Sequence, residues 1–329
     1  SALASAVAVS GSPATRGGRA APSSASSSSF RGVALPARRA CMSSKARAPL
    51  VCASAAASEQ GTSRRCLFLG AASAIAASAL LPSMPAMAEG AKIVVVGATG
   101  NSGKRVVKQL QAAGYEVTAG VRTADKAKKA GYSNFAIVDV NDDVATQAKA
   151  LAGAEVVICC TGFIPGNPFK MGEAAKAVDN EGTVRLVDAS VAAGAKKFVL
   201  ISSILTNGRA WGKEKAPGFV ITNAFGQVLD QKIIAENHLR KSGMDWTIVR
   251  PGGLKDDEPK GSLVISPEDT LASGEISRDL VASVVVRAAT SEGAKNKVLE
   301  IVETGTCVAD QCPADVDSKG LGKDPASWF

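Results

Sequence analysis

The sequence of 329 residues contains a single histidine and only seven cysteines. The histidine, His238, lies among charged residues of a predicted helix, where we expect a surface residue without a partner. No second histidine and no repeated cysteine pair accompanies it, so the pattern predicts no metal site. Cys159 and Cys160 end an apolar run, where cysteine acts as a small hydrophobic residue. Cys307 and Cys312 lie in a polar segment and would form a disulfide in an oxidising compartment.

Acidic residues are almost absent from residues 1–88. This segment contains nine Arg or Lys residues and one acid, Glu59, so it carries the whole formal net charge of +8. The rest of the chain is neutral, and bulk charge therefore gives no support for nucleic-acid binding. A leader that is rich in Ser, Ala and Arg but poor in acids predicts a chloroplast transit peptide.

A second targeting signal lies inside this leader. The pair Arg64-Arg65 precedes a weakly apolar stretch, Leu67–Leu81, and small residues up to Ala88 offer a cleavage site. Two signals in series are typical of a thylakoid-lumen protein. The alternatives are a chance arginine pair in a stromal protein and association with the stromal surface of the thylakoid. The apolar stretch is shorter than the ~20 residues that a spanning helix needs.

The most informative segment combines a strand, a glycine-rich turn and a helix. Ile93–Val96 is a β-branched run, which predicts a strand buried on both faces of a parallel sheet. Three glycines at intervals of three residues and an amphipathic helix follow, and in that context they indicate binding of a dinucleotide pyrophosphate at the helix N-terminus. The alternative is the βα loop of another doubly wound protein. The predicted contacts are Gly97, Thr99, Gly100, Asn101, Ser102 and Gly103.

The end of the second predicted strand indicates which dinucleotide is bound. Glu116–Val121 is followed by Arg122 and not by an acid. An acid there would bind the ribose 2′-hydroxyl of NAD, whereas Arg122 can pair with the 2′-phosphate of NADP, assisted by Thr123 and Lys126. The sequence therefore favours NADP(H). The alternative is a solvated surface arginine.

Residues 89–302 fit one Rossmann-like α/β domain. Strands and helices alternate, which predicts a doubly wound, mostly parallel sheet with helices on both faces. Residues 303–329 have no apolar period, and we expect a flexible tail. Further strands are predicted at Ala136–Asp139, Val156–Cys160, Lys197–Ser202, Trp246–Arg250 and Lys297–Val302. Helices are predicted at Asp143–Leu151, Asn180–Ala193, Val228–Ser242 and Arg278–Ala289.

Several motifs accompany the glycine turn and the arginine. They are Thr161-Gly-Phe163, Asp179-Asn-Glu-Gly-Thr183, Lys197-Phe-Val-Leu-Ile-Ser-Ser-Ile204 and Thr247-Ile-Val-Arg-Pro-Gly-Gly-Leu254. With these motifs, the chain from Lys92 to Val302 resembles the atypical short-chain dehydrogenase/reductases. Within them it looks closest to chloroplast NAD(P)-binding proteins of the NAD(P)-dependent epimerase/dehydratase type. The motifs are specific for fold and cofactor, and they do not identify a substrate.

The resemblance implies further cofactor contacts. Asp139, at the end of the third strand, would accept a hydrogen bond from the adenine amino group. Thr161 and Gly162 would lie along the cofactor. Pro251 and Gly252 would contact its nicotinamide end.

The resemblance also implies three catalytic residues. Lys232 would hold the nicotinamide ribose, Ser203 would polarise a carbonyl, and Asn180 would be the family's structural asparagine. The alternatives are a solvated helix lysine, a serine that hydrogen-bonds at a strand end, and an asparagine that caps a helix.

One departure from the family pattern concerns the general acid. The family has a tyrosine four residues before the lysine, and here the position is Val228, which cannot donate a proton. The proton would then come from Ser203, Lys232, Asp230, water or the substrate. The sequence predicts an NADP(H)-binding reductase, monomeric or a small homo-oligomer, that moves hydride to or from a small carbonyl, enone or flavin-like acceptor. The alternatives are a non-catalytic, NADPH-responsive scaffold or assembly factor for thylakoid complexes and, less favoured without the tyrosine, an epimerase or dehydratase.

Overall fold

The computed structural model describes residues 91–308, 311–312 and 325–329, and the predicted leader lies outside them. The strands of the main sheet are β1 (Ile93–Val96), β2 (Val117–Val121), β3 (Phe135–Ile137), β4 (Val156–Cys159), β5 (Lys197–Ile201), β6 (Asp245–Pro251), β8 (Leu263–Ser266) and β10 (Lys297–Glu303). Their order is β3-β2-β1-β4-β5-β6-β10-β8. Every neighbouring pair is parallel except β10 and β8, so the prediction of a mostly parallel, doubly wound sheet is confirmed.

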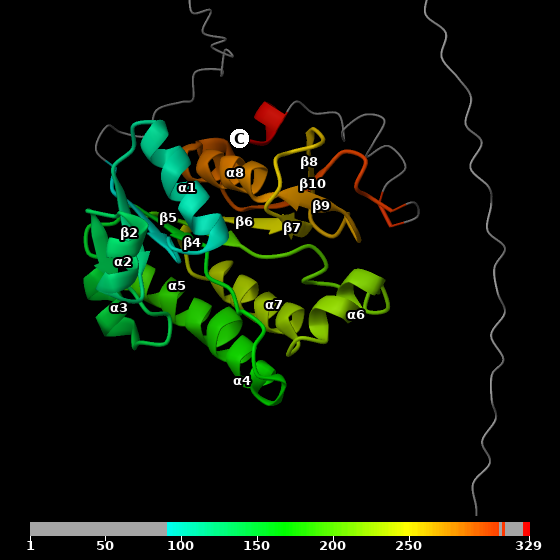
Figure 1. The fold of residues 1–329 in the computed structure, drawn as a ribbon, viewed down its shortest axis with the longest axis horizontal. Helices are drawn as coiled ribbons and strands as arrows, with labels where there is room; N and C mark the ends of the chain where they lie inside the picture. The colour runs from blue at the N-terminus through cyan, green and yellow to red at the C-terminus, as the bar shows by residue number, and fades with distance from the viewer. Residues whose placement is uncertain (1–90, 309–310, 313–324) are drawn as a thin grey trace, which may run out of the picture. The chain divides into compact units, whose positions relative to one another are not determined.

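Helices cover both faces of this sheet. They are α1 (Asn101–Ala112), α2 (Ala124–Ala130), α3 (Val144–Ala150), α4 (Met171–Ala175), α5 (Thr183–Ala192), α6 (Pro217–Asn223), α7 (Val228–Leu239) and α8 (Arg278–Thr290). In Figure 1, α1 and α8 lie on one side of the sheet, and α5 and α7 lie on the other. Ile93 and Val95 join the apolar cluster under α1 and α8, whereas Val94 and Val96 join the cluster under α5. All four β-branched residues of β1 are therefore buried, as expected for a strand between two layers of helices.

Several elements differ from the sequence prediction. The helix predicted from Asn180 begins at Thr183, and a π-helix, Lys176–Gly182, precedes it. Asn180 lies inside that π-helix, so the interpretation of it as a helix cap is wrong. Asp139 lies two residues beyond β3 and not at its end. The strand β8 and the small parallel sheet of β7 (Gly253–Lys255) and β9 (Glu275–Ser277) were not predicted, because these strands are only three or four residues long and surrounded by Gly, Pro and charged residues.

A buried ion cluster closes the carboxyl end of β6. The guanidinium of Arg250 has no exposed surface, and its Nη2 lies 2.7 Å from Glu236 and 2.9 Å from Glu268. Its Nη1 lies 2.9 Å from Asp269 and 3.3 Å from Glu300. Glu236 and Glu300 are also fully buried. The cluster therefore ties α7, β10 and the segment after β8 to the central sheet.

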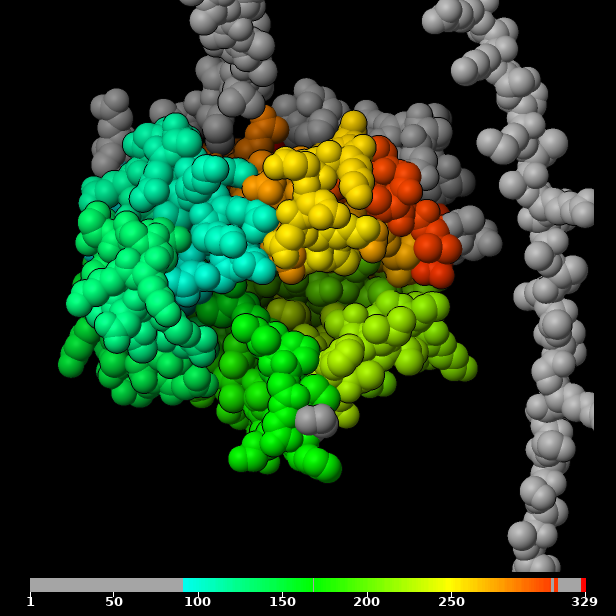
Figure 2. All heavy atoms as spheres, in the orientation of Figure 1, coloured from blue at the N-terminus to red at the C-terminus, as the bar shows by residue number. Residues whose placement is uncertain are grey.

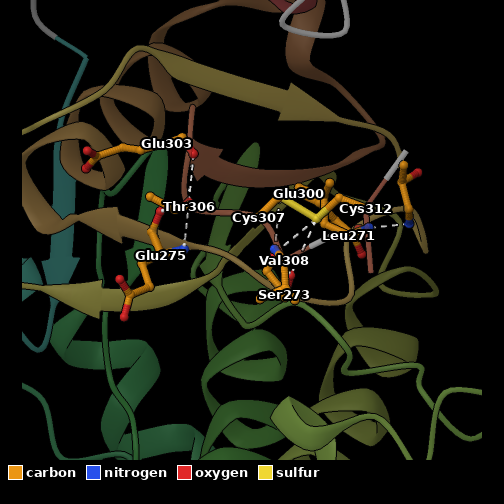
Figure 3. The surroundings of a disulfide bond; sticks show 10 residues. Leu271, Ser273, Glu275, Glu300, Glu303, Thr306, Cys307, Val308 and Cys312 are labelled. Carbon is orange, nitrogen blue, oxygen red and sulfur yellow. Dashed lines mark hydrogen bonds between the residues drawn. A yellow bond between two sulfur atoms is a disulfide. The ribbon is translucent and has the colours of Figure 1, made fainter. Parts of the chain in front are cut away.

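The described part of the tail is attached to the domain at two places. A disulfide joins Cys307 and Cys312, and the Val308 N–H donates to the Ser273 hydroxyl at 2.9 Å (Figure 3). Trp328 and Phe329 pack against the cluster under α1 and α8. Whether the rest of the tail is flexible stays a prediction, because it lies outside the described residues. Among the described helices, none has the length and apolar character that crossing a bilayer requires.

Candidate functional site

The glycine turn after β1 brings helix and strand into close contact. A Cβ atom on Gly103 would lie 2.2 Å from the Gly97 carbonyl oxygen, which leaves no room for any other residue. Gly97 itself has a φ of 81°, a conformation that favours glycine. Within the described chain no side chain caps α1, and its first turn carries no acid. The backbone N–H groups of this turn are thus available to an anion, as a phosphate site at a helix N-terminus requires.

A pocket of about 690 Å³ runs from the end of β2 past this turn to α4. Figure 2 shows the hollow between the cyan segment with β1 and α1 and the green segment with α4. Seven of the predicted cofactor contacts line the pocket: Gly97, Thr99, Gly100, Arg122, Asp139, Thr161 and Gly162. They come from the carboxyl ends of β1 to β4, where a doubly wound sheet binds its ligand.

One end of the pocket is basic. Arg122, Lys126 and Lys129 line it, and no carboxylate of the described residues lies within ion-pair distance of any of the three side chains. The Thr123 hydroxyl accepts from the Lys126 N–H and caps α2. Three cations without an ion-pair partner among the described residues are suited to bind an anionic group such as a phosphate. Lys129 was missed from sequence, because only the turn of α2 brings it beside Arg122.

The part of the pocket around Asp139 also contains a residue that the sequence did not reveal. Asp139 accepts hydrogen bonds from the backbone N–H and the side-chain amide of Asn141, both at 3.0 Å. Asn141 lines the pocket as well. The Asn141 side chain therefore orients the Asp139 carboxylate, although the contact of Asp139 with adenine stays a prediction.

A nearly buried ion pair, Lys232 with Asp179, lies behind the pocket wall that contains Phe163, and neither of its residues lines the pocket. Lys232 Nζ lies 2.8 Å from Asp179 Oδ1, and the two side chains are 15% and 1% exposed. The other carboxylate oxygen, Oδ2, accepts the Phe163 N–H at 3.0 Å, and Phe163 lines the pocket. Burial alone would lower the pKa of Lys232, but the Asp179 carboxylate raises it above its usual value. The sequence did not reveal Asp179, because only the π-helix decides which of the neighbours Asp179 and Asn180 faces Lys232.

The other predicted catalytic residues make contacts of their own and do not join this pair. The amide of Asn180 donates to Gln231 Oε1 at 2.9 Å. Ser203 follows β5, and its carbonyl accepts the Thr206 hydroxyl. Neither Asn180 nor Ser203 lines the pocket. Val228 is the first residue of α7, so no hydroxyl stands in the tyrosine's place.

Six predicted cofactor contacts are not among the residues that line the pocket: Asn101, Ser102, Gly103, Lys232, Pro251 and Gly252. The first three form the opening turn of α1, where a phosphate would meet backbone N–H groups. Gly252 is packed tightly, because a Cβ there would lie 2.5 Å from the Gly274 carbonyl oxygen. Their contacts with a cofactor remain predictions.

His238 has a partner, contrary to the expectation from sequence. Its Nε2 lies 2.6 Å from Asp188 Oδ1 on α5, and both side chains are more than a third exposed. In the described part of the chain, no group of three or more His, Cys, Asp or Glu residues is arranged to bind a metal. The pair is therefore a surface contact between α5 and α7.

The chain is similar to known proteins over the domain just described. Residues 97–292 match the NAD(P)H-binding family. A chloroplastic protein of Arabidopsis thaliana is 48% identical over 220 residues, which are 64% of this chain and 76% of that protein. Protein TIC 62 of Pisum sativum, also chloroplastic, is 32% identical over 237 residues. That alignment covers 65% of this chain and 43% of the pea protein, so the chain spans less than half of the length of that relative.

Two solved structures share the fold. The oxidoreductase ylbE from Lactococcus lactis has a TM-score of 0.55 and 27% identity, with 66% of this chain and 92% of that chain covered. The anaerobilin reductase ChuY from Escherichia coli has a TM-score of 0.52 and 24% identity, with 66% and 100% covered. At that identity the second likeness concerns the fold alone. The chain therefore belongs to the NAD(P)H-binding family, a group of Rossmann-fold proteins whose ligand is a nicotinamide nucleotide.

Proposed function

We propose that this protein is an NADP(H)-dependent oxidoreductase of the chloroplast, acting on a small carbonyl, enone or flavin-like acceptor. The observation that carries the choice of NADP(H) is the basic end of the pocket. Arg122, Lys126 and Lys129 line it, and β2 ends without an acid. Support for the chloroplast comes from the acid-poor leader and from the chloroplastic relatives. The twin arginines favour the thylakoid lumen, with the stroma or the stromal thylakoid surface as the alternative.

The residues of the pocket fit the nucleotide in three respects. The space that a Cβ on Gly103 would need is filled by the turn, so the backbone at the opening of α1 is held against the place of the pyrophosphate. The basic end matches a 2′-phosphate. Lys232, near the far wall, is suited to donate hydrogen bonds to ribose hydroxyls. When bound, the nucleotide supplies or accepts a hydride.

The proton for such a reaction has few sources in this chain. Val228 offers none, and Lys232 holds its proton firmly beside Asp179. Both carboxylate oxygens of Asp230 accept hydrogen bonds from the Arg209 guanidinium at 2.7 Å, so they are already occupied. Ser203 does not reach the pocket lining. We therefore propose that water or the acceptor itself supplies the proton, which suits conjugated acceptors better than simple ketones.

The test is a titration of the full chain with NADPH and NADH, in parallel with Arg122→Ala and a matched control, Lys241→Ala. Lys241 is an exposed cation that does not line the pocket. The 2′-phosphate is doubly charged and desolvated on binding, so we expect a loss of about tenfold to a hundredfold in NADPH affinity for Arg122→Ala and no loss for the control. Equal affinity of the wild type for NADH and NADPH would contradict NADP(H) specificity. No binding of either nucleotide would refute the proposed function.

A non-catalytic, NADPH-responsive scaffold is the second candidate, and Val228 is the observation that favours it. Both candidates bind the nucleotide, so turnover separates them. Oxidation of NADPH with a panel of quinone, enone and flavin acceptors, slowed in Lys232→Met, would support the reductase. Tight NADPH binding without turnover on any acceptor would support the scaffold.

A further inference from the structure

The ion pair between Asp179 and Lys232 lies directly behind one wall of the pocket. Thr161, Gly162 and Phe163 form that wall. Asp179 Oδ2 accepts the Phe163 N–H, and Oδ1 lies 3.9 Å from where a Cβ on Gly162 would be. One nearly buried carboxylate thus contacts both the wall of the pocket and the lysine ammonium.

The π-helix is the reason why Asp179 can make both contacts. Its wider turn, Lys176–Gly182, packs against α7, which carries Lys232. Single π-helical turns within a helix are frequent at functional sites, where they place a side chain that an α-helix would not. Asn180, the next residue, is turned toward Gln231 instead.

Three ionisable groups on different elements face the Lys232 ammonium. They are Asp179 on the π-helix, Cys159 on β4 and Glu236 on α7. Glu236 is engaged by Arg250 and by the Ser202 hydroxyl. Burial raises the pKa of Cys159, so its thiol stays neutral. Asp179 is therefore the partner that keeps Lys232 charged.

We infer that Asp179 is the positioning residue for the nicotinamide half of the site. One of its carboxylate oxygens fixes the Thr161–Phe163 wall, and the other holds the Lys232 ammonium as a hydrogen-bond donor toward the bound nucleotide. An ammonium has three N–H donors, and Asp179 occupies one, which leaves the others for ribose or acceptor oxygens. Because Asp179 neutralises the charge, this end of the site favours uncharged oxygen groups over anions. The inference rests on the proposed function, since it requires a nucleotide in the pocket.

The experiment compares two ligands that share the adenosine half. NADPH and adenosine 2′,5′-bisphosphate are titrated into the full-length wild type, Asp179→Asn and Lys232→Met, from about pH 7 to about pH 9.5, a range below the ordinary lysine pKa of about 10.4. We expect both variants to bind NADPH about tenfold more weakly at neutral pH, because a charge-assisted hydrogen bond is lost or misplaced. Binding of the bisphosphate should stay unchanged, since it contains no nicotinamide half.

The pH profile separates positioning from a structural role. Without the Asp179 carboxylate, burial lowers the pKa of Lys232, so the NADPH affinity of Asp179→Asn should fall further as the pH rises. The wild type and Lys232→Met should show no such additional fall. An equal loss for both ligands in Asp179→Asn, or wild-type NADPH affinity in both variants, would overturn the inference while leaving the proposed function intact. Failure of the wild type to bind either ligand would overturn both. Should Asp179→Asn not fold, Asp179→Glu takes its place, since it keeps the charge but moves the carboxylate; unchanged NADPH affinity in that variant would overturn the inference.

Discussion

Replacement of Arg250 by methionine is expected to destabilise the protein strongly. Arg250 contacts four carboxylates, and two of them, Glu236 and Glu300, share its complete burial. Methionine fills a similar volume but leaves these two carboxylates without their cation. Removal of one partner from a buried ion cluster costs about 3–5 kcal/mol, because the remaining charges stay desolvated. That is a large part of the total stability of a domain, which is about 5–15 kcal/mol.

The loss of stability in Arg250→Met should depend on pH, and the pKa of Glu300 determines whether it grows or shrinks as the pH rises. Burial raises the pKa of Glu300, although three backbone N–H groups and Arg250 counteract it. Without Arg250 the pKa of Glu300 in the folded state rises further above its unfolded value. The folded variant then binds more protons than the unfolded chain, so its stability is greatest at low pH and is lost as the pH rises through the folded pKa. The variant should therefore lose less stability at about pH 5 than at about pH 8.

Urea denaturation of wild type and Arg250→Met at both pH values measures the loss in the free energy of unfolding and its dependence on pH. Arg240→Met is the matched control, because Arg240 contacts Glu236 and Glu268 but is 27% exposed. Its loss should be about 1 kcal/mol or less, as for other partly exposed pairs. A loss for Arg250→Met that equals the control, or that grows as the pH falls, would refute the reasoning.

Two further predictions concern stability. Gly103→Ala should cost about 1–3 kcal/mol and weaken nucleotide binding, because its Cβ would lie 2.2 Å from the Gly97 carbonyl oxygen. Gly172→Ala in α4 has no atom within 4 Å of the added Cβ and should be neutral or stabilise by up to about 1 kcal/mol; equal thermal shifts in the two variants would contradict the packing argument. Reduction of the Cys307–Cys312 disulfide, which closes a loop with a sequence separation of 5, should cost about 2 kcal/mol in urea denaturation. An unchanged midpoint after addition of a reductant, or in the double serine variant, would count against it.

Local patterns predicted the turn after β1 and most of the residues that lie around it in the pocket. The β-branched run of β1 and the three glycines specify a strand, a turn and a helix from residues that are neighbours in sequence. Seven predicted contacts line one pocket, because parallel strands all end at the same edge of the sheet. The fold class follows from the same alternation of strands and helices.

The ion pair behind the pocket could not be predicted from sequence, because it depends on a contact between residues that are distant in the chain. Asp179 and Lys232 are separated by more than fifty positions, and no local signal distinguishes Asp179 from Asn180. A π-helix turns the first toward Lys232 and the second toward Gln231. The ion cluster around Arg250 similarly joins α7, β10 and the segment after β8.

The sequence alone thus determined the fold class, the glycine turn after β1 and the place of Arg122 and Lys126 at the end of β2, since each depends on short-range geometry or on one strand end. Only the tertiary structure decided which acid pairs with Lys232 and which carboxylates surround Arg250. A buried charge needs a partner within hydrogen-bond distance, and the packing of separate elements determines which group lies there.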